Sequence, residues 1–319
     1  MLVRLTPPKR KLPAFSPIIS AVFASLLAAG CAASHTTVVK PPANPALFQT
    51  ASKADLVGRY DSLASAVKSL NWTVTITLTA GSAYTGVIKQ YHEVKGFILA
   101  QKPADIRVIG QAPVVGTNIF DMVSDGETFR ISIPSQHKFL TGSAKLERQS
   151  AKPIENLRPQ HLTGAIFWEP IPTGQEVLIE EAGDGAEDYV LTVLRHPAEE
   201  PTGWEIGEKV WFGRTDLNVI RRQTYEAGGK LASDVAYSSW DTFPGAQGTS
   251  GPVRYPRQVV LSRPGNDYKL QIGITKAAFN ETITADRFEL KQPEGEELVK
   301  VGEDAPETKP DMKPAEPKD

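Results

Sequence analysis

The acids, bases and nucleophiles of this 319-residue sequence match no familiar catalytic arrangement. Its five histidines, at positions 35, 92, 137, 161 and 196, have no regular separation and no cysteine at a zinc-ligand spacing. Adjacent carboxylates such as Glu180 and Glu181 would point to opposite faces of a strand. The sequence lacks the G-x-S-x-G motif of a nucleophile elbow and the glycine-rich loops that hold phosphates. We therefore expect a protein that is not an enzyme and needs neither a metal nor another cofactor.

The single cysteine, Cys31, does indicate chemistry, because it ends a targeting segment. A basic stretch over residues 4–11 precedes an apolar run, Pro17–Ala29, that is too short to span a bilayer as a helix. The run leads into Leu27-Ala28-Ala29-Gly30-Cys31, which resembles the lipobox of bacterial lipoproteins, where the cysteine is diacylated after cleavage. We expect residues 1–30 to be a signal peptide and Cys31 to carry acyl chains. The alternative is a plain secretory peptide cut near Ala32-Ala33-Ser34.

The net charge of the mature chain indicates which partners to expect, and the residue after Cys31 indicates the membrane. Removal of residues 1–30 takes away four basic residues and no acidic one, so the formal net charge becomes −2 − 4 = −6. This balance, without an arginine-rich tract, argues against nucleic acid as a partner. Acyl chains would hold the protein at a membrane. We expect the periplasmic face of the outer membrane, because lipoproteins kept at the inner membrane mainly carry Asp where this chain has Ala32.

Hydrophobic spacing places one helix before a long series of strands. Residues 31–51 are rich in Pro and Ala and predict a flexible tether. Ser52 and Asp55 resemble a capping box. Apolar side chains then follow at spacings of three and four, typical of an amphipathic helix: Leu56, Tyr60, Leu63, Val67 and Leu70. Residues 292–319 are acidic and Pro-rich, without aromatic side chains, and predict a disordered tail. The folded domain is expected to span 52–291.

Alternating apolar and polar residues predict antiparallel strands across that domain. The predicted strands are 72–78, 86–101, 105–111, the two strands that flank Asp125-Gly126, 138–141, 176–182, 187–195, 204–212, 217–226, 230–240, 254–263 and 267–275. Asp125-Gly126 predicts a hairpin with a two-residue turn. Its expected cross-strand pairs are Ser124 with Glu127, Met122 with Phe129, Phe120 with Ile131, and Asp121 with Arg130. The fold class is therefore mainly β (α+β), with a large curved antiparallel sheet.

Residues 143–175 interrupt the strand pattern with prolines and an unusually apolar composition. Short helices are predicted over 154–157 and 159–167, the second with Pro159 in its first turn. Together with the N-terminal helix, this broken helical segment would cover the sheet. It is either a cap over one end of the sheet or a lid over a cavity.

The run 97–142 carries a resemblance to a known family. Its pieces are Pro103–Gly110, Ala112-Pro113, Val115-Gly116, Phe120-Asp121, Ser124-Asp125-Gly126 and Pro134. Together they resemble the LolA/LolB-like superfamily of bacterial lipoprotein carriers, and look closest to poorly characterised LolB-like outer-membrane lipoproteins. The resemblance implies a half-open β-barrel, an antiparallel sheet curled around helices, whose apolar interior binds acyl chains of lipoproteins or other lipids. No position matches the family's lid-latching arginine or its membrane-inserting loop residue.

The expected function is non-covalent binding of a lipid or lipoprotein acyl chain, in lipid or lipoprotein trafficking or envelope biogenesis. A lipoprotein client or a periplasmic carrier would be a further partner. The candidate binding residues are the inward-facing apolar side chains of two strand regions: Trp72, Val74, Ile76, Leu78, Phe120, Met122, Phe129, Ile131 and Ile133. The alternative is a non-catalytic envelope scaffold or partner-binding lipoprotein, with a packed core and no cavity. The same residues would then be ordinary core.

Overall fold

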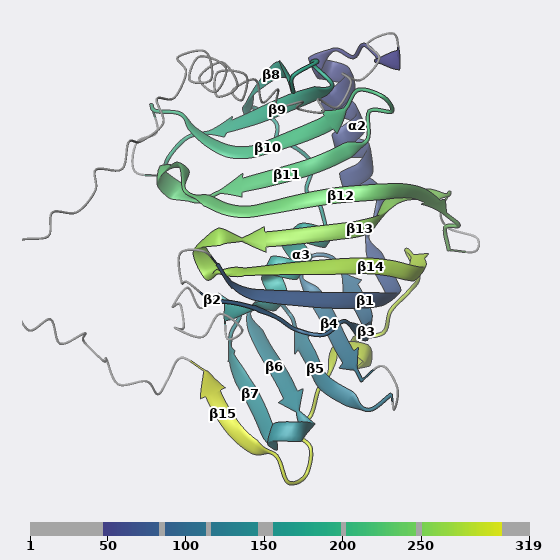
Figure 1. Ribbon diagram of the computed structural model, residues 1–319, viewed down its shortest axis with the longest axis vertical. Helices are drawn as coiled ribbons and strands as arrows, with labels where there is room; N and C mark the ends of the chain where they lie inside the picture. Colours follow the sequence, from purple (N-terminus) through teal and green to yellow (C-terminus); the bar gives the residue numbers. More distant parts are fainter. Residues whose placement is uncertain are drawn as a thin grey trace, which may run out of the picture. The chain divides into compact units, whose positions relative to one another are not determined.

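A computed structural model of the chain describes residues 47–82, 87–112, 116–145, 156–198, 202–246 and 251–301 (Figure 1). Cys31, the predicted signal peptide and most of the predicted tether lie outside these ranges. Within them the chain forms one sheet and two α-helices, α2 (Lys53–Ala66) and α3 (Pro159–Ile166). The predictions of a mainly β fold and of a large antiparallel sheet are confirmed.

The strands follow the predicted order along the chain. The first seven are β1 (Ser69–Ser82), β2 (Val87–Gln90), β3 (Val94–Gln101), β4 (Asp105–Gln111), β5 (Asn118–Ser124), β6 (Thr128–Ile133) and β7 (Lys138–Ser143). After α3 come β8 (Glu176–Ala182), β9 (Asp188–Arg195), β10 (Glu205–Gly213), β11 (Val219–Tyr225), β12 (Leu231–Phe243), β13 (Val253–Arg263), β14 (Tyr268–Phe279) and β15 (Glu297–Val301). Short 3-10 turns occupy Pro134–Gln136, Ala227–Gly229, Pro264–Asn266 and Ala285–Phe288.

Strand β1 joins two meanders into one sheet. It pairs with β3, from which the order continues to β7, and with β14, from which the order runs back to β8. These neighbours are antiparallel, whereas β15 runs parallel to β7. In the described part of the chain β15 and β8 end the sheet on opposite sides, so it is not closed into a barrel.

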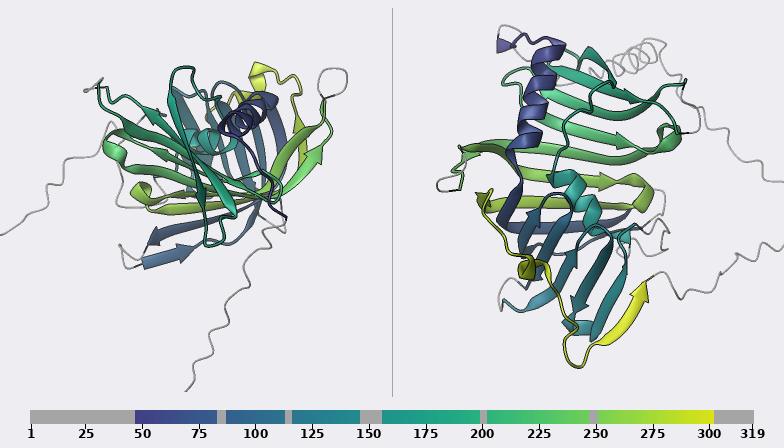
Figure 2. Two further views of the ribbon diagram at one scale, coloured as in Figure 1. Left: turned by 90° about the horizontal axis from the view of Figure 1, so that it is seen from above. Right: turned by 180° about the vertical axis from the view of Figure 1, so that it is seen from behind.

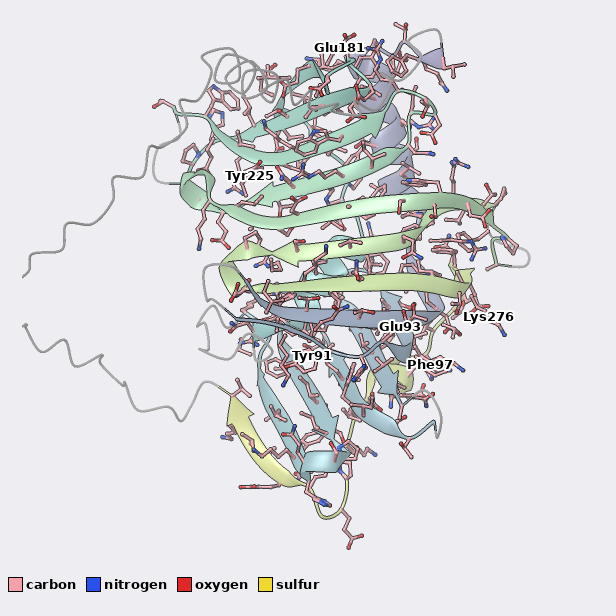
Figure 3. All side chains as sticks on the ribbon, viewed as in Figure 1. Tyr91, Glu93, Phe97, Glu181, Tyr225 and Lys276 are labelled. Atoms are coloured by element: carbon pink, nitrogen blue, oxygen red, sulfur yellow. The ribbon has the colours of Figure 1, made fainter. Side chains whose placement is uncertain are left out.

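Both helices lie on the same face of the sheet, called here the inner face. The right-hand view of Figure 2 shows α2 and α3 in front of the strands, and Figure 1 shows them behind. Side chains on this face are apolar and buried, such as Val74, Val259 and Ile272. The outer face carries polar side chains, such as Lys276 on β14 (Figure 3). This division follows from the period-2 alternation in the strands.

Helix α2 begins as its sequence predicts. Ser52 Oγ accepts a hydrogen bond from the Asp55 N–H (3.2 Å), and Asp55 Oδ2 accepts one from the Ser52 N–H (2.9 Å). This confirms the capping box. The helix buries Leu56 and Tyr60, but it ends at Ala66, so Leu70 belongs to β1 rather than to the predicted helical stripe.

The predicted hairpin of β5 and β6 forms, but its predicted register is wrong by two residues. Met122 pairs with Ile131 and Ser124 with Phe129. Four residues, Asp125–Thr128, therefore lie between the last two paired residues, instead of the predicted two. Asp125 Oδ1 accepts hydrogen bonds from the N–H groups of Glu127 (2.8 Å) and Thr128 (2.7 Å). Such a side chain offers the backbone a local partner and favours a longer loop. Because the offset is even, every predicted inward residue keeps its face.

The predicted cross-strand partners of this hairpin are corrected accordingly. None of the pairs Ser124–Glu127, Met122–Phe129, Phe120–Ile131 and Asp121–Arg130 forms. Asp121 lies opposite Ser132, and its carboxylate is bound bidentately by Arg107 of β4, at 3.0 and 2.7 Å. A guanidinium on the neighbouring strand matches the planar carboxylate with two parallel bonds.

Three predicted boundaries are also corrected. The predicted strand 86–101 is two strands, β2 and β3, which both pair with β1. Part of the predicted disordered tail is ordered as strand β15, which pairs with β7. The Glu297 N–H donates to His137 O (2.7 Å) where this pairing begins. The predicted tether is attached from Gln49, whose N–H donates to Arg214 O (2.7 Å). In both attached segments backbone hydrogen bonds to a sheet edge or turn replace the apolar burial that the composition lacks.

Candidate functional site

The C-terminal end of α3 is bound to the inner face of the sheet through its own carbonyl groups. The last four carbonyls of a helix have no partner within it. Here Thr163 O accepts from the Phe167 N–H (2.7 Å). The other three accept from side chains of β11, β12 and β13: Gly164 O from Arg222 Nη2 (2.7 Å), Ala165 O from Tyr237 Oη (2.9 Å) and Ile166 O from Tyr255 Oη (2.7 Å). Every carbonyl left over at this helix end therefore has a partner.

Arg222 is the charged centre of this attachment. Its side chain is 8% exposed and its Nε lies 2.7 Å from Glu208 Oε1. Glu208 also accepts a hydrogen bond from Tyr60 Oη (3.0 Å), which links α2 to the same cluster. Burial raises the pKa of Glu208, while the Arg222 charge and the Tyr60 hydrogen bond oppose that rise. The guanidinium also lies at the negative end of the α3 dipole, which favours a cation there.

Trp168 packs directly after this end of α3. Its indole N–H donates to Tyr237 Oη (3.1 Å), and the ring is 4% exposed. It stacks on Tyr60 at 5.9 Å and on Tyr255 at 6.2 Å, and it meets Tyr237 and Trp240 at steep interplanar angles of 70° and 59°. Lys102 Nζ donates to Trp168 O (2.7 Å) and to Ala64 O (3.1 Å) at the end of α2. The segment after α3 is thus fixed to both the sheet and α2.

The N-terminal half of α3 covers an apolar gap on the inner face. The gap has a volume of about 20 Å³, which is the space of roughly one water molecule. Its walls are apolar side chains of five strands and of the α3 segment: Ile76, Ile98, Val108, Phe120, Met122, Leu157, Leu162, Leu270 and Ile272. As it stands, this gap is too small for an acyl chain.

The structure brings only part of the predicted binding set together. Ile76, Phe120 and Met122 line the apolar gap. Leu78 and Ile131 are half-buried beside the same core, and Trp72 and Val74 are buried within it, with Trp72 5.2 Å from the Tyr255 ring. Phe129 lies away from the gap, under the Arg158 guanidinium at 5.9 Å. Ile133 is half-buried near the end of β6.

The sequence prediction missed Arg222 and Glu208. Both carried a visible signal, because each falls at an inward position of an alternating strand, where apolar residues are expected. Glu208 shares its face with Val210 and Phe212, which are fully buried, and Arg222 lies opposite Val210. Opposite charges at inward positions of adjacent strands indicate a buried polar cluster.

Two features are absent from the described ranges. They contain no group of three or more His, Cys, Asp or Glu side chains placed to hold a metal ion. None of their helices is long and apolar enough to cross a membrane.

Comparison with known proteins gives structural neighbours alone. No family model matches the sequence. No curated protein matches it either. Similar solved structures include a LolA superfamily protein from Nitrosomonas europaea, with 9% identity, 76% of this chain and 99% of that chain covered, and a TM-score of 0.45. A DUF1329 family protein from Desulfovibrio piger has 14% identity, coverage of 74% and 95%, and a TM-score of 0.44.

A third neighbour is a protein from Vibrio parahaemolyticus described as an outer membrane lipoprotein-sorting protein domain. It has 9% identity, coverage of 74% and 94%, and a TM-score of 0.42. The superfamily that the 97–142 block resembles is therefore named among the neighbours. Identities this low concern the fold alone, so a function has to be argued from the site.

Proposed function

We propose that this protein binds a lipid or a lipoprotein acyl chain non-covalently between the inner face of the sheet and α3. The observation that carries the proposal is the unequal attachment of α3. Its C-terminal end is held by three side-chain hydrogen bonds to carbonyls and by Trp168. Its N-terminal half is held by two side-chain contacts, from Gln160 to Ala144 O and from His161 to Tyr268 Oη. Leu162 in that half, with Leu157 just before the helix, covers an apolar wall. Moving the N-terminal half outward would break the Gln160 and His161 hydrogen bonds and open that wall as one side of a half-open barrel, while the C-terminal attachment stays intact.

The free energies of such an opening are of comparable size. Uncovering two leucine side chains costs roughly 3–6 kcal/mol, at about 1.5–3 kcal/mol each. Loss of the Gln160 and His161 hydrogen bonds costs about 1 kcal/mol each in addition. An acyl chain that buries ten methylenes gains roughly 8 kcal/mol, at about 0.8 kcal/mol each. The ligand can therefore offset the opening, while the empty protein stays closed over a gap of about 20 Å³.

Native mass spectrometry tests this proposal. The mature chain with Cys31→Ser, which carries no acyl chains of its own, is exposed to phospholipid vesicles and then isolated. A mass increase of one lipid is expected, and it should fall strongly in Met122→Ala, which alters the apolar wall. Ile133→Ala is the matched control, because Ile133 lies outside that wall and its loss should leave the adduct. If only the mass of the lipid-free chain is detected after exposure to the vesicles, the proposal is wrong.

A second candidate function is an envelope scaffold with a packed core. The small volume of the apolar gap favours it. Thermal unfolding separates the two candidates, because only a protein that binds lipid in its folded state gains stability when lipid is added. An unchanged melting temperature at saturating lipid supports the scaffold.

The anchor belongs to the same proposal. Diacylated Cys31 would hold the domain at the periplasmic face of the outer membrane, close to a lipid source or a lipoprotein client. Metabolic labelling with radioactive palmitate should mark the wild type and leave Cys31→Ser unlabelled. Label that persists in the variant would exclude Cys31 as the acylation site.

A further inference from the structure

A second and much larger cavity lies at the N-terminal end of α3. Its volume is about 890 Å³, and its lining is mostly polar. The walls come from the start of α3, the turn between β11 and β12, the turn between β13 and β14, and the ends of β7 and β9. Tyr225, at the end of β11, marks one side of it (Figure 3). This cavity is called the polar pocket below.

The polar pocket is strongly cationic. Five of its described lining residues carry a positive charge, and they are Lys145, Arg158, Arg195, Lys230 and Arg263. Against them stands one lining carboxylate, Glu226, so the described lining has a formal charge of 5 − 1 = +4 with histidine neutral. Three of the five cations have a carboxylate close by: Lys145 lies 2.7 Å from Glu127, Arg195 lies 2.9 Å from Glu205, and Lys230 lies 3.4 Å from Glu226. The excess nevertheless marks the pocket as a place for an anion.

Arg263 is the cation that most needs an anionic partner. Its Nε donates to Asn266 Oδ1 (3.0 Å), a neutral acceptor, and among the described residues no carboxylate forms an ion pair with it. Burial lowers the pKa of Arg263, and the nearby Tyr268 and Glu226 offset this only in part. Arg263 is half-buried, so its guanidinium is only partly hydrated, and a phosphate or carboxylate can satisfy its fork of donors.

The N-terminal end of α3 adds to the positive electrostatic potential of the polar pocket. Within the described residues the N-cap residue, Arg158, makes no side-chain capping hydrogen bond, and the first turn of α3 contains no acidic residue. The positive end of the helix dipole therefore faces the pocket, where Gln160 and His161 form part of the wall. His161 Nδ1 lies 2.7 Å from Tyr268 Oη, which holds the imidazole in place.

The polar pocket and the apolar gap share one wall. In the segment 156–162, Leu157 and Leu162 line the apolar gap, while Arg158 and His161 line the polar pocket. A ligand with a charged head and an apolar tail could therefore contact both cavities across a single turn of chain.

We propose that the polar pocket binds a phosphate group, and that the ligand is an anionic amphiphile whose head lies against Arg263 and whose acyl chain runs under α3. The tail half of this statement rests on the proposed function. The phosphate half does not, because free inorganic phosphate offers the same oxygens to the same guanidinium.

The experiment uses the mature chain with Cys31→Ser and two probes. Inorganic phosphate is titrated by calorimetry at low salt, and vesicles of phosphatidylglycerol or phosphatidylcholine with identical acyl chains are compared by native mass spectrometry. Arg263→Gln is expected to weaken phosphate binding at least tenfold and to abolish the preference for phosphatidylglycerol. Arg257→Gln is the matched control: it removes the same charge from the same strand, outside the pocket, and should change affinity less than twofold.

The outcomes separate the two proposals. If phosphate binds and Arg263→Gln weakens it, but no lipid adduct is seen, the anion site is supported and the acyl-chain function is excluded. Equal uptake of both lipids, with phosphate binding absent or indifferent to Arg263→Gln, keeps acyl-chain binding and overturns the anion site. Should Arg263→Gln unfold, the double variant Lys145→Gln/Lys230→Gln replaces it, because both side chains are more than 60% exposed. Unchanged phosphate affinity in that variant also overturns the anion site.

Discussion

The two ends of α3 belong to a helix of only eight residues, yet they are held by different contacts. At the C-terminal end, three side chains bind three consecutive carbonyls, and Trp168 packs among four aromatic rings. At the N-terminal end, a small apolar gap and a large polar pocket lie on either side of the chain. Gln160 and His161 also form hydrogen bonds at that end, but with fewer contacts. A helix that is held more strongly at one end is suited to pivot rather than to detach.

The polar groups at the two ends of α3 therefore have different roles. Around Arg222 an ion pair with Glu208 and a hydrogen bond to Gly164 O fix a single arrangement of helix and sheet. Around Arg263 the polar groups leave charge excess, which a ligand can neutralise. Substitutions at the C-terminal end should therefore cost stability, and substitutions at the N-terminal end should cost binding.

The largest loss of stability is expected from Trp168→Ala. The substitution empties the centre of the aromatic cluster and removes the hydrogen bond to Tyr237 Oη. Loss of a buried tryptophan side chain costs about 3–5 kcal/mol. Urea unfolding followed by circular dichroism measures it. A decrease in the free energy of unfolding below about 1 kcal/mol would mean that the C-terminal end of α3 is attached no more strongly than its N-terminal end.

Arg222→Leu should come next, at about 3 kcal/mol or more, because it leaves Glu208 buried without its cation. The double variant Arg222→Leu/Glu208→Leu should recover most of that loss, since replacing both members of a buried pair is often close to neutral. Denaturant midpoints of the two single variants and the double variant form the required cycle. Additive losses would show that the pair does not act as a unit.

Sequence alone predicted the strands and helices well, because alternation and spacing are local signals. The capping box of Ser52 and Asp55, the bounds of β8 and the helix starting at Pro159 all agree with the structure. The hairpin register failed because the Asp125 side chain binds the loop backbone, a contact that the Asp-Gly pattern does not reveal. The candidate site was found in part, through Ile76, Phe120 and Met122.

The remaining site residues depend on contacts between distant segments. Arg222 meets Gly164 across 58 positions of the sequence, and His161 meets Tyr268 across 107. No local period encodes such a meeting. A charge on the apolar face of a strand was the one available signal, and it identifies Glu208 and Arg222 without naming their partners.

The pH dependence of stability should report on the N-terminal end of α3. Burial, followed by the charges of Arg263 and Arg158, lowers the pKa of His161 from 6.5 to about 3. Tyr268 also contacts the ring. Between pH 6.5 and 3 the unfolded chain binds a proton at this position that the folded chain does not, so stability falls as the pH falls.

The expected contribution of His161 is at most about 1.4 kcal/mol per pH unit within that window. His161→Phe keeps a ring beside Tyr268 but cannot titrate, so its stability should fall less steeply between pH 6.5 and 4. Urea unfolding at several pH values measures both slopes. Phosphate should flatten the wild-type slope, because a bound anion favours the protonated imidazole. Parallel slopes in the two proteins would show that His161 is not held neutral by its surroundings.

The smallest change in stability is expected from Lys145→Gln/Lys230→Gln at the mouth of the polar pocket. Their ion pairs with Glu127 and Glu226 are exposed, so each contributes about 0–1 kcal/mol. Removing two like charges from a cationic pocket offsets part of that loss, and the denaturant midpoint should stay nearly unchanged while phosphate affinity falls. If this pair instead lowers stability as much as Trp168→Ala does, the pocket residues are structural, and both ends of α3 serve to fix the helix.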